Sequence, residues 1–222
     1  MKPVRVLIAD DHEIVLQGIR TIVQSRNDFE ICGDASDGRQ AVQLAASLRP
    51  DIVVIDIGMP QLNGLDATRQ IVHNDPKVNV LVLTMHESEQ IVRDVLAAGA
   101  RGYLLKTDAG RDLISALEAL ASRKTFFTSK VAEIVLGTYL NGGPERQWSK
   151  DVLTGREREV VQLLAEGKST KEVAVALGLS VKTAETHRSN LMRKLDIHSV
   201  SELVLYAVRN NLVHVVQPPP VD

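Results

Sequence analysis

The 222-residue sequence has little of several residue types, and each shortage excludes something. Cys32 is its only cysteine, so an intrachain disulfide is impossible and a reducing compartment is favoured. Aromatic residues make up only 3% of the chain, whereas 44% is hydrophobic and 24% charged, as in ordinary soluble globular proteins. No run reaches the roughly 20 apolar residues of a membrane span, and the N-terminus lacks the apolar core of a signal peptide. We therefore expect a cytoplasmic protein without membrane contact.

The chain also has little net charge, −2 in total, but the charge is unevenly distributed. Residues 1–149 carry 16 basic and 19 acidic side chains, a net −3, and residues 150–222 carry 10 and 9, a net +1. This imbalance is too small to indicate nucleic-acid binding by itself. The sequence around Cys32 is apolar and typical of a strand, which favours a buried packing role for the thiol.

Strand-like and helix-like stretches alternate five times along the first 122 residues. The predicted strands are 4–10, 29–35, 51–56, 79–84 and 102–105. The predicted helices lie near 13–25, 38–48, 65–73, 88–98 and 110–122, with Ser88 and Asp108 as N-terminal residues of the last two. Repeated units of this length imply a parallel sheet with helices on both faces, which is a doubly wound (βα)5 domain.

After residue 122 the strand signal disappears, and an all-α domain of four helices is predicted. Its helices lie near 155–166, 170–177, 181–195 and 199–210. Thr154 and Glu157 form a capping-box pattern, Ser180 is a suitable N-cap, and Gly167 and Gly178 are suitable left-handed residues at helix ends. The predicted domain boundaries are 1–122 for the first domain, 123–152 for a linker with a helix at 129–140, 153–213 for the helical domain, and 214–222 for a tail.

Carboxylates stand where two predicted strands end. Asp10 and Asp11 close the first strand, and Asp56 ends the third. Ligands of open α/β sheets bind at the carboxyl edge of the strands, and three carboxylates gathered there repel one another unless a cation or a proton intervenes. Any single aspartate at a strand end could instead cap the following loop. Acids at two strand ends favour a hard metal ion and chemistry on one of the acids.

Two further groups lie at the same predicted edge, since Thr84 ends the fourth strand and Lys106 follows the fifth. With the acidic pair after the first strand and Asp56 after the third, this arrangement resembles the receiver domain of two-component response regulators. The resemblance covers about residues 3–122 and rests on five positions and their spacings.

The resemblance implies a phosphorylation site and a metal site. Asp56 would accept a phosphoryl group from a histidine kinase. Mg²⁺ would be held by Asp11, Asp56 and the backbone carbonyl of Gly58, while Asp10 would assist largely through water. The chain would then be no enzyme beyond phosphotransfer to its own aspartate and self-dephosphorylation.

The remaining receiver residues are expected to read out the phosphate. Lys106 would pair with it, and Thr84 would bond to it once formed. The added charge would draw Thr84 inward and change the packing of Tyr103, which makes both switch residues. For Tyr103 the alternative is a half-buried aromatic residue whose hydroxyl is in water.

Three positions depart from the family pattern. Thr107 follows Lys106 where many receivers have proline, and a cis bond without proline costs about 3 kcal/mol, so a trans or a strained loop is expected. Gly58 offers no side chain two residues after Asp56, and His86 stands two residues after Thr84. Both are candidates for setting the lifetime of the phosphate.

Segments 170–177 and 181–195 have the lengths and the turn of a helix-turn-helix, although periodicity alone fits a small helical bundle equally well. The second segment settles the preference, because it has an apolar stripe with cations lying off it and one opposing acid, Glu185. The stripe consists of Val181, Ala184, Leu191 and Leu195, and the cations are Lys182, Arg188, Arg193 and Lys194.

Residues 150–213 closely resemble the LuxR/FixJ-type DNA-binding domain, through the motifs at 153–160, 165–174 and 181–195. The resemblance implies that 181–195 is the recognition helix in the major groove. The implied DNA-binding residues are Thr170, Lys171, Lys182, Thr183, Glu185, Thr186, Arg188, Ser189 and Arg193. By position, Glu185, Thr186 and Ser189 face base edges, and the cations bind phosphates. Segment 199–210 would complete the core and offer a dimer face.

Together these features predict a phosphorylation-controlled transcription regulator. Its partners would be a histidine kinase, double-stranded DNA and a second copy of the chain when phosphorylated or DNA-bound, with RNA polymerase as a further possible partner. One alternative is an aspartate-nucleophile phosphatase, which would need a second acid where Gly58 stands. Another is a DNA-binding protein whose receiver serves only as an interaction module.

Overall fold

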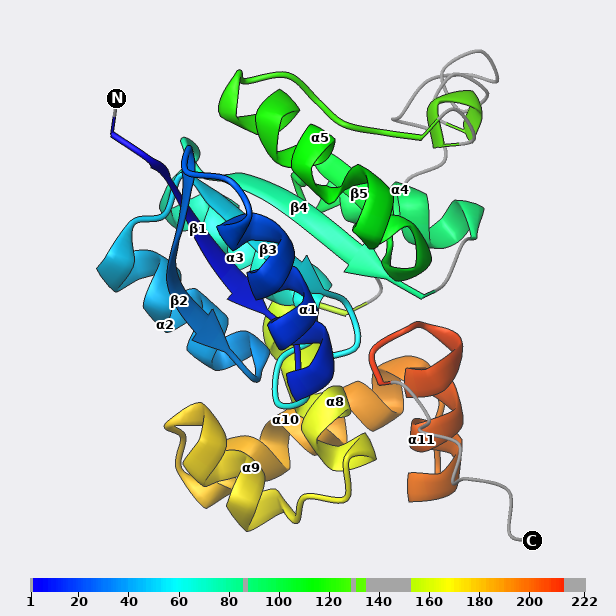
Figure 1. The fold of residues 1–222 in the computed structure, drawn as a ribbon. Coiled ribbons are helices and arrows are strands. Elements are labelled where there is room, and N and C mark those ends of the chain that lie inside the picture. Colours follow the sequence, from blue (N-terminus) through cyan, green and yellow to red (C-terminus); the bar gives the residue numbers. More distant parts are fainter. Residues whose placement is uncertain (1, 86–87, 129–130, 135–152, 214–222) are drawn as a thin grey trace, which may run out of the picture. The chain divides into compact units, whose positions relative to one another are not determined.

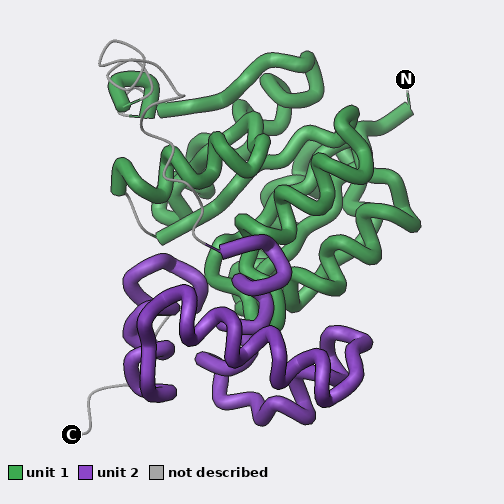
Figure 2. The backbone as a smooth tube through the Cα atoms, turned by 180° about the vertical axis from the view of Figure 1, so that it is seen from behind, with its two compact units in different colours: residues 1–150 green, residues 151–222 purple. Residues whose placement is uncertain are grey.

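The computed structural model describes residues 2–85, 88–128, 131–134 and 153–213, and it divides the chain into two compact units, Met1–Lys150 and Asp151–Asp222 (Figures 1 and 2). Residues 131–134 of the predicted helix 129–140 are helical. The rest of that helix, the connector after it and the tail 214–222 lie outside the described residues. In the part of the chain that is described, no helix has the length and hydropathy needed to span a bilayer.

The first unit contains a five-stranded parallel sheet with the strand order β2-β1-β3-β4-β5. Its strands are β1 (Val4–Ala9), β2 (Phe29–Ala35), β3 (Ile52–Asp56), β4 (Asn79–Thr84) and β5 (Gly102–Leu105). Every predicted strand is confirmed to within one residue at each end. The agreement follows from the runs of apolar, β-branched residues, which only a strand covered on both faces can bury.

Helices cover both faces of this sheet, so the predicted doubly wound domain is confirmed (Figure 1). They are α1 (Glu13–Gln24), α2 (Gly38–Leu48), α3 (Gly64–Asn74), α4 (Glu89–Ala97) and α5 (Ala109–Ala121), with a 3₁₀ turn η1 (Lys106–Asp108) before α5. Alternate strand residues face opposite layers. In β3, Ile52 and Val54 pack in the cluster with α1 and α5, whereas Val53 and Ile55 pack in the cluster with α2, α3 and α4.

The two predicted N-terminal residues behave differently. Ser88 caps α4, since its hydroxyl accepts from the backbone N–H of Ile91 at 3.2 Å. Asp108 precedes α5 as predicted, but its side chain makes no capping bond and accepts instead from Arg111 at 3.2 Å. The reason is the 3₁₀ turn, which holds Asp108 at φ −98° and ψ −7° rather than in the extended conformation of a capping residue.

The edges of the sheet show what sequence patterns miss. Cys32 lies on the edge strand β2 and packs against the core, but it is only partly buried, so the predicted packing role is confirmed and the predicted full burial is not. An edge strand has a neighbour on one side only, which leaves its side chains less covered.

On the opposite edge of the sheet, Phe126 forms a bridge with Gly102 of β5, and its backbone exchanges hydrogen bonds with Arg101 and Tyr103 at 3.0 Å. Residues after α5 therefore cover the free edge of β5.

The second unit is helical, and all four of its predicted helices are confirmed. They are α8 (Gly155–Ala165), α9 (Thr170–Leu177), α10 (Val181–Leu195) and α11 (Val200–Arg209). Thr154 and Glu157 form the predicted capping box, and the Ser180 side chain caps α10. Gly178 (φ 63°) and Gly167 (φ 85°) take the left-handed conformation, as predicted. One apolar core, with Leu163, Val173, Leu191 and Leu203 among its members, is shared by the four helices.

One glycine in the first unit fixes the loop after β3. Gly64 begins α3 directly against the end of that strand, and a Cβ atom there would lie 1.9 Å from the carbonyl oxygen of Asp56. The backbone N–H of Gly64 also donates to the carbonyl of Ile57 at 2.9 Å. Any side chain at this position would push the backbone of Asp56 out of place.

We predict that Gly64→Ala lowers the free energy of unfolding by about 1–3 kcal/mol, because the added methyl group overpacks against rigid backbone. Gly18→Ala in α1 is the matched control. A Cβ there meets nothing within 4 Å, so this substitution should raise the free energy of unfolding by about 0.5–1 kcal/mol. Urea unfolding of the full chain measures both, and equal effects of the two substitutions would contradict the close approach at Gly64.

Candidate functional site

The buried acids lie at the carboxyl edge of the sheet, where β1 and β3 are neighbours. Asp10 directly follows β1 and is 0% exposed, and Asp56 is the last residue of β3 and is 6% exposed. The chain order reverses between these strands, because β2 lies on one side of β1 and β3 on the other. Such a reversal is the place at which open α/β sheets bind their ligands.

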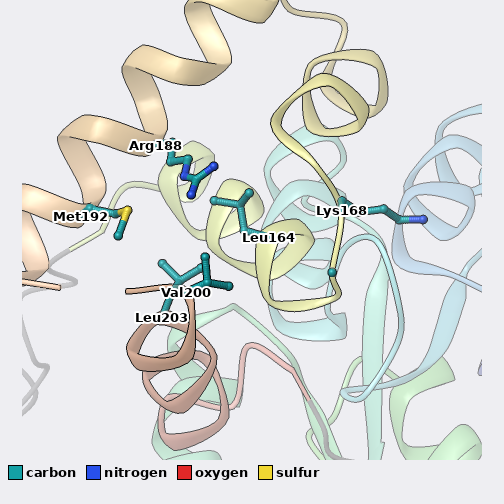
Figure 3. A pocket seen from close by; sticks show the side chains of 7 residues that line it. Leu164, Lys168, Arg188, Met192, Val200 and Leu203 are labelled. Carbon is teal, nitrogen blue, oxygen red and sulfur yellow. The ribbon is translucent and has the colours of Figure 1, made fainter. Parts of the chain in front are cut away.

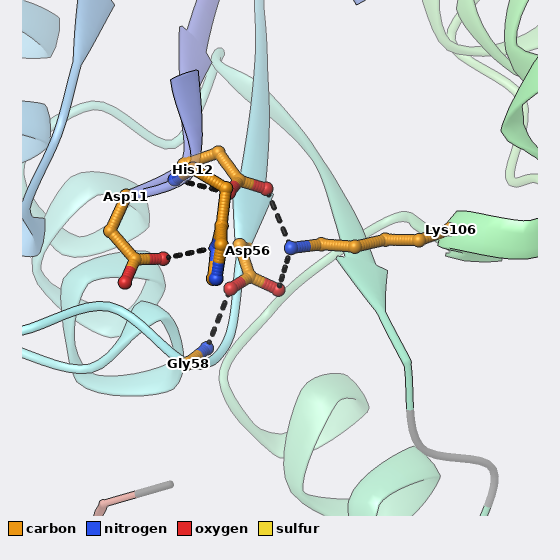
Figure 4. A network of polar contacts seen from close by, with 6 residues as sticks. Asp11, His12, Asp56, Gly58 and Lys106 are labelled. Carbon is orange, nitrogen blue, oxygen red and sulfur yellow. Dashed lines mark hydrogen bonds and ion pairs between the residues drawn. The ribbon is translucent and has the colours of Figure 1, made fainter. Parts of the chain in front are cut away.

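A lysine joins these acids. The ammonium Nζ of Lys106 lies 2.7 Å from Oδ2 of Asp10 and 3.1 Å from Oδ1 of Asp56, and the Lys106 side chain is only 11% exposed (Figure 4). The second oxygen of Asp56 accepts from the backbone N–H of Gly58 at 3.1 Å. Both oxygens of Asp56 are thus held, one by the residue after β5 and one by the loop after β3.

The electrostatics of the cluster follow from burial and from its mixture of charges. Burial raises the pKa of Asp56, with Asp10 adding to this shift and Lys106 opposing it. Burial acts to lower the pKa of Lys106, but Asp56 and Asp10 outweigh it, so that this pKa is raised and the amine stays protonated. Three carboxylates, counting Asp11, then face a single ammonium.

The net negative charge of this cluster fits a bound divalent cation. Asp10, Asp11 and Asp56 supply the carboxylate oxygens that Mg²⁺ prefers, and one lysine cannot neutralise all three. The donor set therefore fits the predicted magnesium site, while the role predicted for the carbonyl of Gly58 stays a prediction.

His12 belongs to the same cluster, and sequence reasoning missed it. Its ring nitrogen Nδ1 lies 2.9 Å from Oδ1 of Asp11 and 3.2 Å from Oδ1 of Asp10, and the imidazole is turned toward Asp11 (Figure 4). The signal that could have identified it is its place directly after the acidic pair.

The predicted switch residues lie on the neighbouring strands. Thr84 ends β4 and is 2% exposed. Tyr103 of β5 is 1% exposed and packs in the cluster with Ile91 and Val95 of α4. The alternative of a half-buried Tyr103 with a wet hydroxyl is therefore wrong in this state.

Of the three departures from the family pattern, two can be located. No peptide bond is cis in the described part of the chain, so Lys106–Thr107 is trans and continues into η1. Gly58 is partly buried beside Asp56. His86 lies outside the described residues.

In the helical unit, most predicted DNA-binding residues are exposed. The exposed ones are Lys171, Lys182, Thr183, Glu185, Thr186, Ser189 and Arg193. Thr170 and Arg188 are partly buried, and the guanidinium of Arg188 donates to the Thr170 hydroxyl at 3.1 Å. This bond ties α10 to the start of α9, which sequence spacing did not indicate. Whether each residue contacts DNA stays a prediction.

The apolar stripe predicted on α10 is only partly correct. Ala184 and Leu191 are buried in the core, and Leu195 packs against it. Val181 is 40% exposed, because the first residue of α10 lies at the turn rather than over the core. Lys194 is held at 2.8 Å by Glu157 of α8, so one of the four cations of α10 already has a counterion.

The helical unit also contains a small pocket of about 120 Å³ (Figure 3). Its lining consists of Leu164, Gly167, Lys168, Arg188, Met192, Val200 and Leu203. The lining contains no acid, and the cluster of Asp10, Asp11 and Asp56 belongs to the other unit. We therefore assign the chemistry to the acidic cluster and no reaction to this pocket.

Comparisons with known families match both units. The profile of the response regulator receiver domain matches residues 6–118, and the profile of bacterial regulatory proteins of the luxR family matches residues 151–207. Transcriptional regulatory protein LiaR of Bacillus subtilis is 38% identical over 95% of this chain and 100% of its own length. Oxygen regulatory protein NreC of Staphylococcus carnosus is 36% identical over 94% of this chain and 99% of its own.

Solved structures agree with these relatives. RcsB of Salmonella typhimurium covers 95% of this chain and 99% of its own, with a TM-score of 0.62 and 28% identity. A complex of RcsB with DNA covers 94% of this chain and 99% of its own chain, with a TM-score of 0.58 and 28% identity. The same receiver and DNA-binding modules thus occur together in proteins that are similar to this chain over nearly its whole length.

The ion pair between Glu157 of α8 and Lys194 of α10 should make the free energy of unfolding depend on pH. Burial acts to raise the pKa of Glu157, but its bonds with Lys194 and Thr154 hold that pKa below its usual value. The charge of Glu157 therefore stabilises the fold above its unfolded pKa of about 4.3, and this contribution is lost as the pH falls through the lower folded value. Glu157→Gln should cost about 0.5–1 kcal/mol at pH 7, and the cost should become smaller as the pH falls below 4.

Urea unfolding followed through the amide resonances of α8 measures this difference at each pH. Glu185→Gln is the control, since it removes an exposed acid from α10 without touching the Glu157–Lys194 pair. A cost of Glu157→Gln that does not vary between pH 7 and pH 3 would show that the pair contributes no stability through its charge.

Proposed function

The chain belongs to the two-component response regulators that join a receiver domain to a LuxR-type DNA-binding domain, and on that premise we propose that phosphorylation of Asp56 controls its binding to DNA. The observation that supports this proposal is the buried ammonium of Lys106 between Asp10 and Asp56. The carboxylate that would act as the nucleophile thus lies beside a cation that can pair with the phosphate.

Asp56 is the phosphoacceptor in this proposal. One of its oxygens attacks the phosphorus of a phosphohistidine on the partner kinase, the P–N bond breaks, and the imidazole leaves with the electron pair. The hydrogen bond from Gly58 and the ion pair with Lys106 fix the orientation of the carboxylate before the attack. Asp11 and Asp56, with the carbonyl of Gly58 and with help from Asp10, would hold Mg²⁺, which would supply charge neutralisation for the transferring group.

Lys106 and Thr84 carry the signal onward. Lys106 is now shared between two carboxylates, so an arriving phosphoryl group can take over its ammonium from Asp56. Thr84 ends the strand adjacent to that of Asp56 and is buried, which supports the proposal that its hydroxyl bonds to the new oxygens. The inward pull on Thr84 changes the packing of Tyr103 against α4, and this is the switch.

The same residues favour a switch over an enzyme that turns over metabolites. Gly58 provides no second acid two residues after Asp56, so hydrolysis is limited to the protein's own phosphoaspartate. The partner is a histidine kinase, and we place the exchange in the cytoplasm, where the DNA target lies.

The output of the switch is DNA binding through α10. Lys182 and Arg193 are exposed cations on this helix and can bind phosphates, while exposed Glu185 and Ser189 can face base edges. The Arg188 side chain is bonded to Thr170, so it can bind a DNA phosphate only if this bond breaks. If the bond persists, Arg188 instead fixes the position of α10 relative to α9. The complexes of RcsB with DNA, a protein similar over 94% of this chain, support this assignment.

Phosphorylation promotes a homodimer in this proposal. Val200 and Leu205 of α11 are 51% and 54% exposed, although large apolar side chains gain by being buried. A structure of two RcsB dimers bound to DNA supports a dimeric DNA-bound form, and a structure of RcsB on a promoter with a phosphomimetic supports DNA binding by the phosphorylated form. Two recognition helices one DNA turn apart would read an inverted repeat. Contact with RNA polymerase stays a prediction from the family resemblance.

The first prediction concerns the acceptor. Asp56→Asn should abolish Mg²⁺-dependent labelling by a small phosphodonor, because an amide cannot displace the leaving group. Intact-protein mass spectrometry measures the labelling. Asp34→Asn is the control, since it removes a half-exposed acid of β2 whose ion pair is with Arg20 of α1 and not with Lys106. Labelling that persists in Asp56→Asn would remove Asp56 from this role.

The second prediction concerns DNA. Lys182→Ala should weaken binding to all sequences alike and make the slope of log K against log[salt] shallower by about 1, because one phosphate contact is lost. Lys194→Ala removes a cation of the same helix that already pairs with Glu157, and it should leave the slope unchanged. Fluorescence anisotropy at several salt concentrations measures both slopes. If the wild type and Lys182→Ala gave the same slope, Lys182 would not contact a phosphate of the DNA backbone.

A further inference from the structure

His12 occupies a helix position that neither capping nor packing explains. It is the N-cap residue of α1, where Ser, Thr, Asp and Asn are preferred because their side chains bond to the first free N–H groups. The His12 side chain makes no such bond. It is also 56% exposed, so it adds little to the core.

The ring is directed instead at the two acids that precede it. The nitrogen Nδ1 lies 2.9 Å from Oδ1 of Asp11 and 3.2 Å from Oδ1 of Asp10, and the three atoms lie within 4.8 Å of one another (Figure 4). Neighbouring ligands of an octahedral ion with bonds of about 2.1 Å are about 3 Å apart. The His12 nitrogen therefore lies from each acid at about the spacing of two neighbouring ligands.

The backbone holds this arrangement in place. The N–H of His12 donates to Oδ1 of Asp10 at 2.9 Å, and Asp10 is itself buried and anchored by Lys106. The imidazole thus starts from a fixed point beside the acidic pocket, with Nδ1 on the side of the two acids.

We propose that His12 is a nitrogen ligand of the metal that the acidic pocket binds, and that it makes the pocket prefer a divalent first-row transition ion such as Co²⁺ over Mg²⁺. The inference rests on the metal site of the proposed function. Mg²⁺ takes oxygen ligands and gives up its water reluctantly, so an imidazole adds little to its binding. Co²⁺ and its neighbours accept imidazole as well as carboxylate, and they bind mixed N/O sites more tightly.

A competing explanation gives the ring the opposite effect. If His12 is only a counterion of Asp11, its ring occupies a carboxylate that a metal ion needs. Removal of the ring would then strengthen the binding of every divalent ion, Mg²⁺ included. The two explanations differ in the sign of one measured change.

The test uses the full chain with Mg²⁺ and Co²⁺ titrated separately into the wild type, His12→Asn and His73→Asn. Asn is a favoured N-cap, so α1 keeps its start. His73 is an exposed histidine in the last turn of α3, and its replacement controls for adventitious binding. Calorimetry gives the affinities. Proton NMR of the Co²⁺ complex shows whether an exchangeable imidazole N–H is shifted far outside the diamagnetic range, which marks a coordinated histidine.

We expect His12→Asn to weaken Co²⁺ binding by about tenfold or more, because loss of even an outer-sphere partner costs a metal site 10–100-fold. Mg²⁺ binding should stay nearly unchanged, and the shifted N–H signal should disappear. His73→Asn should match the wild type in all three respects. Unchanged Co²⁺ affinity, a retained N–H signal, or stronger binding of both ions in His12→Asn would each overturn the proposal.

A further variant separates this inference from the proposed function. Asp11→Asn should weaken the binding of both ions if the acidic pocket is the metal site. If Asp11→Asn weakens Mg²⁺ binding but His12→Asn changes nothing, only the role of His12 fails. If Asp11→Asn leaves Mg²⁺ binding intact, the metal site of the proposed function fails, and the inference fails with it.

Discussion

The ammonium of Lys106 between the carboxylates of Asp10 and Asp56 is the interaction on which the rest of the receiver site depends. It joins the residues that follow or end three separate strands, β1, β3 and β5, in a region nearly closed to water. A buried charge that loses its partner is strongly destabilising, so these three residues hold one another in place. The same pairing makes the site responsive, because any anion that reaches Lys106 competes with Asp56 for it.

The arrangement also explains why the site needs more than one cation. Three carboxylates and a lysine leave net negative charge at the edge of the sheet, which opposes an incoming phosphoryl group until a metal ion offsets it. His12 affects which metal ion the pocket prefers, since it adds a nitrogen donor to an otherwise oxygen-rich pocket. The chemistry in the first unit and the exposed cations of α10 in the second unit then form the input and the output of one regulator.

Most of the fold and the central site could be predicted from the sequence, because both depend on local patterns. Runs such as 51–56 are strands whatever surrounds them, and acids at strand ends meet at one edge by topology. His12 was missed although it follows the acidic pair directly, whereas the other misses in the helical unit and before α5 depend on residues far apart in the chain or on exact backbone angles. Lys194 pairs with Glu157, and Arg188 with Thr170, through helix packing that no periodicity reveals. The 3₁₀ turn altered the role of Asp108 for the same reason.

Charge added at Asp56 should change the affinity of the helical unit for DNA. The most direct measurement compares the dissociation constant of the full chain for a duplex obtained by selection, with and without phosphodonor and Mg²⁺, at one fixed salt concentration. We predict that phosphorylation tightens binding by about tenfold or more, a coupling of about 1.4 kcal/mol, in the wild type but not in Asp56→Asn. Equal affinity of the phosphorylated and unphosphorylated wild type would contradict it.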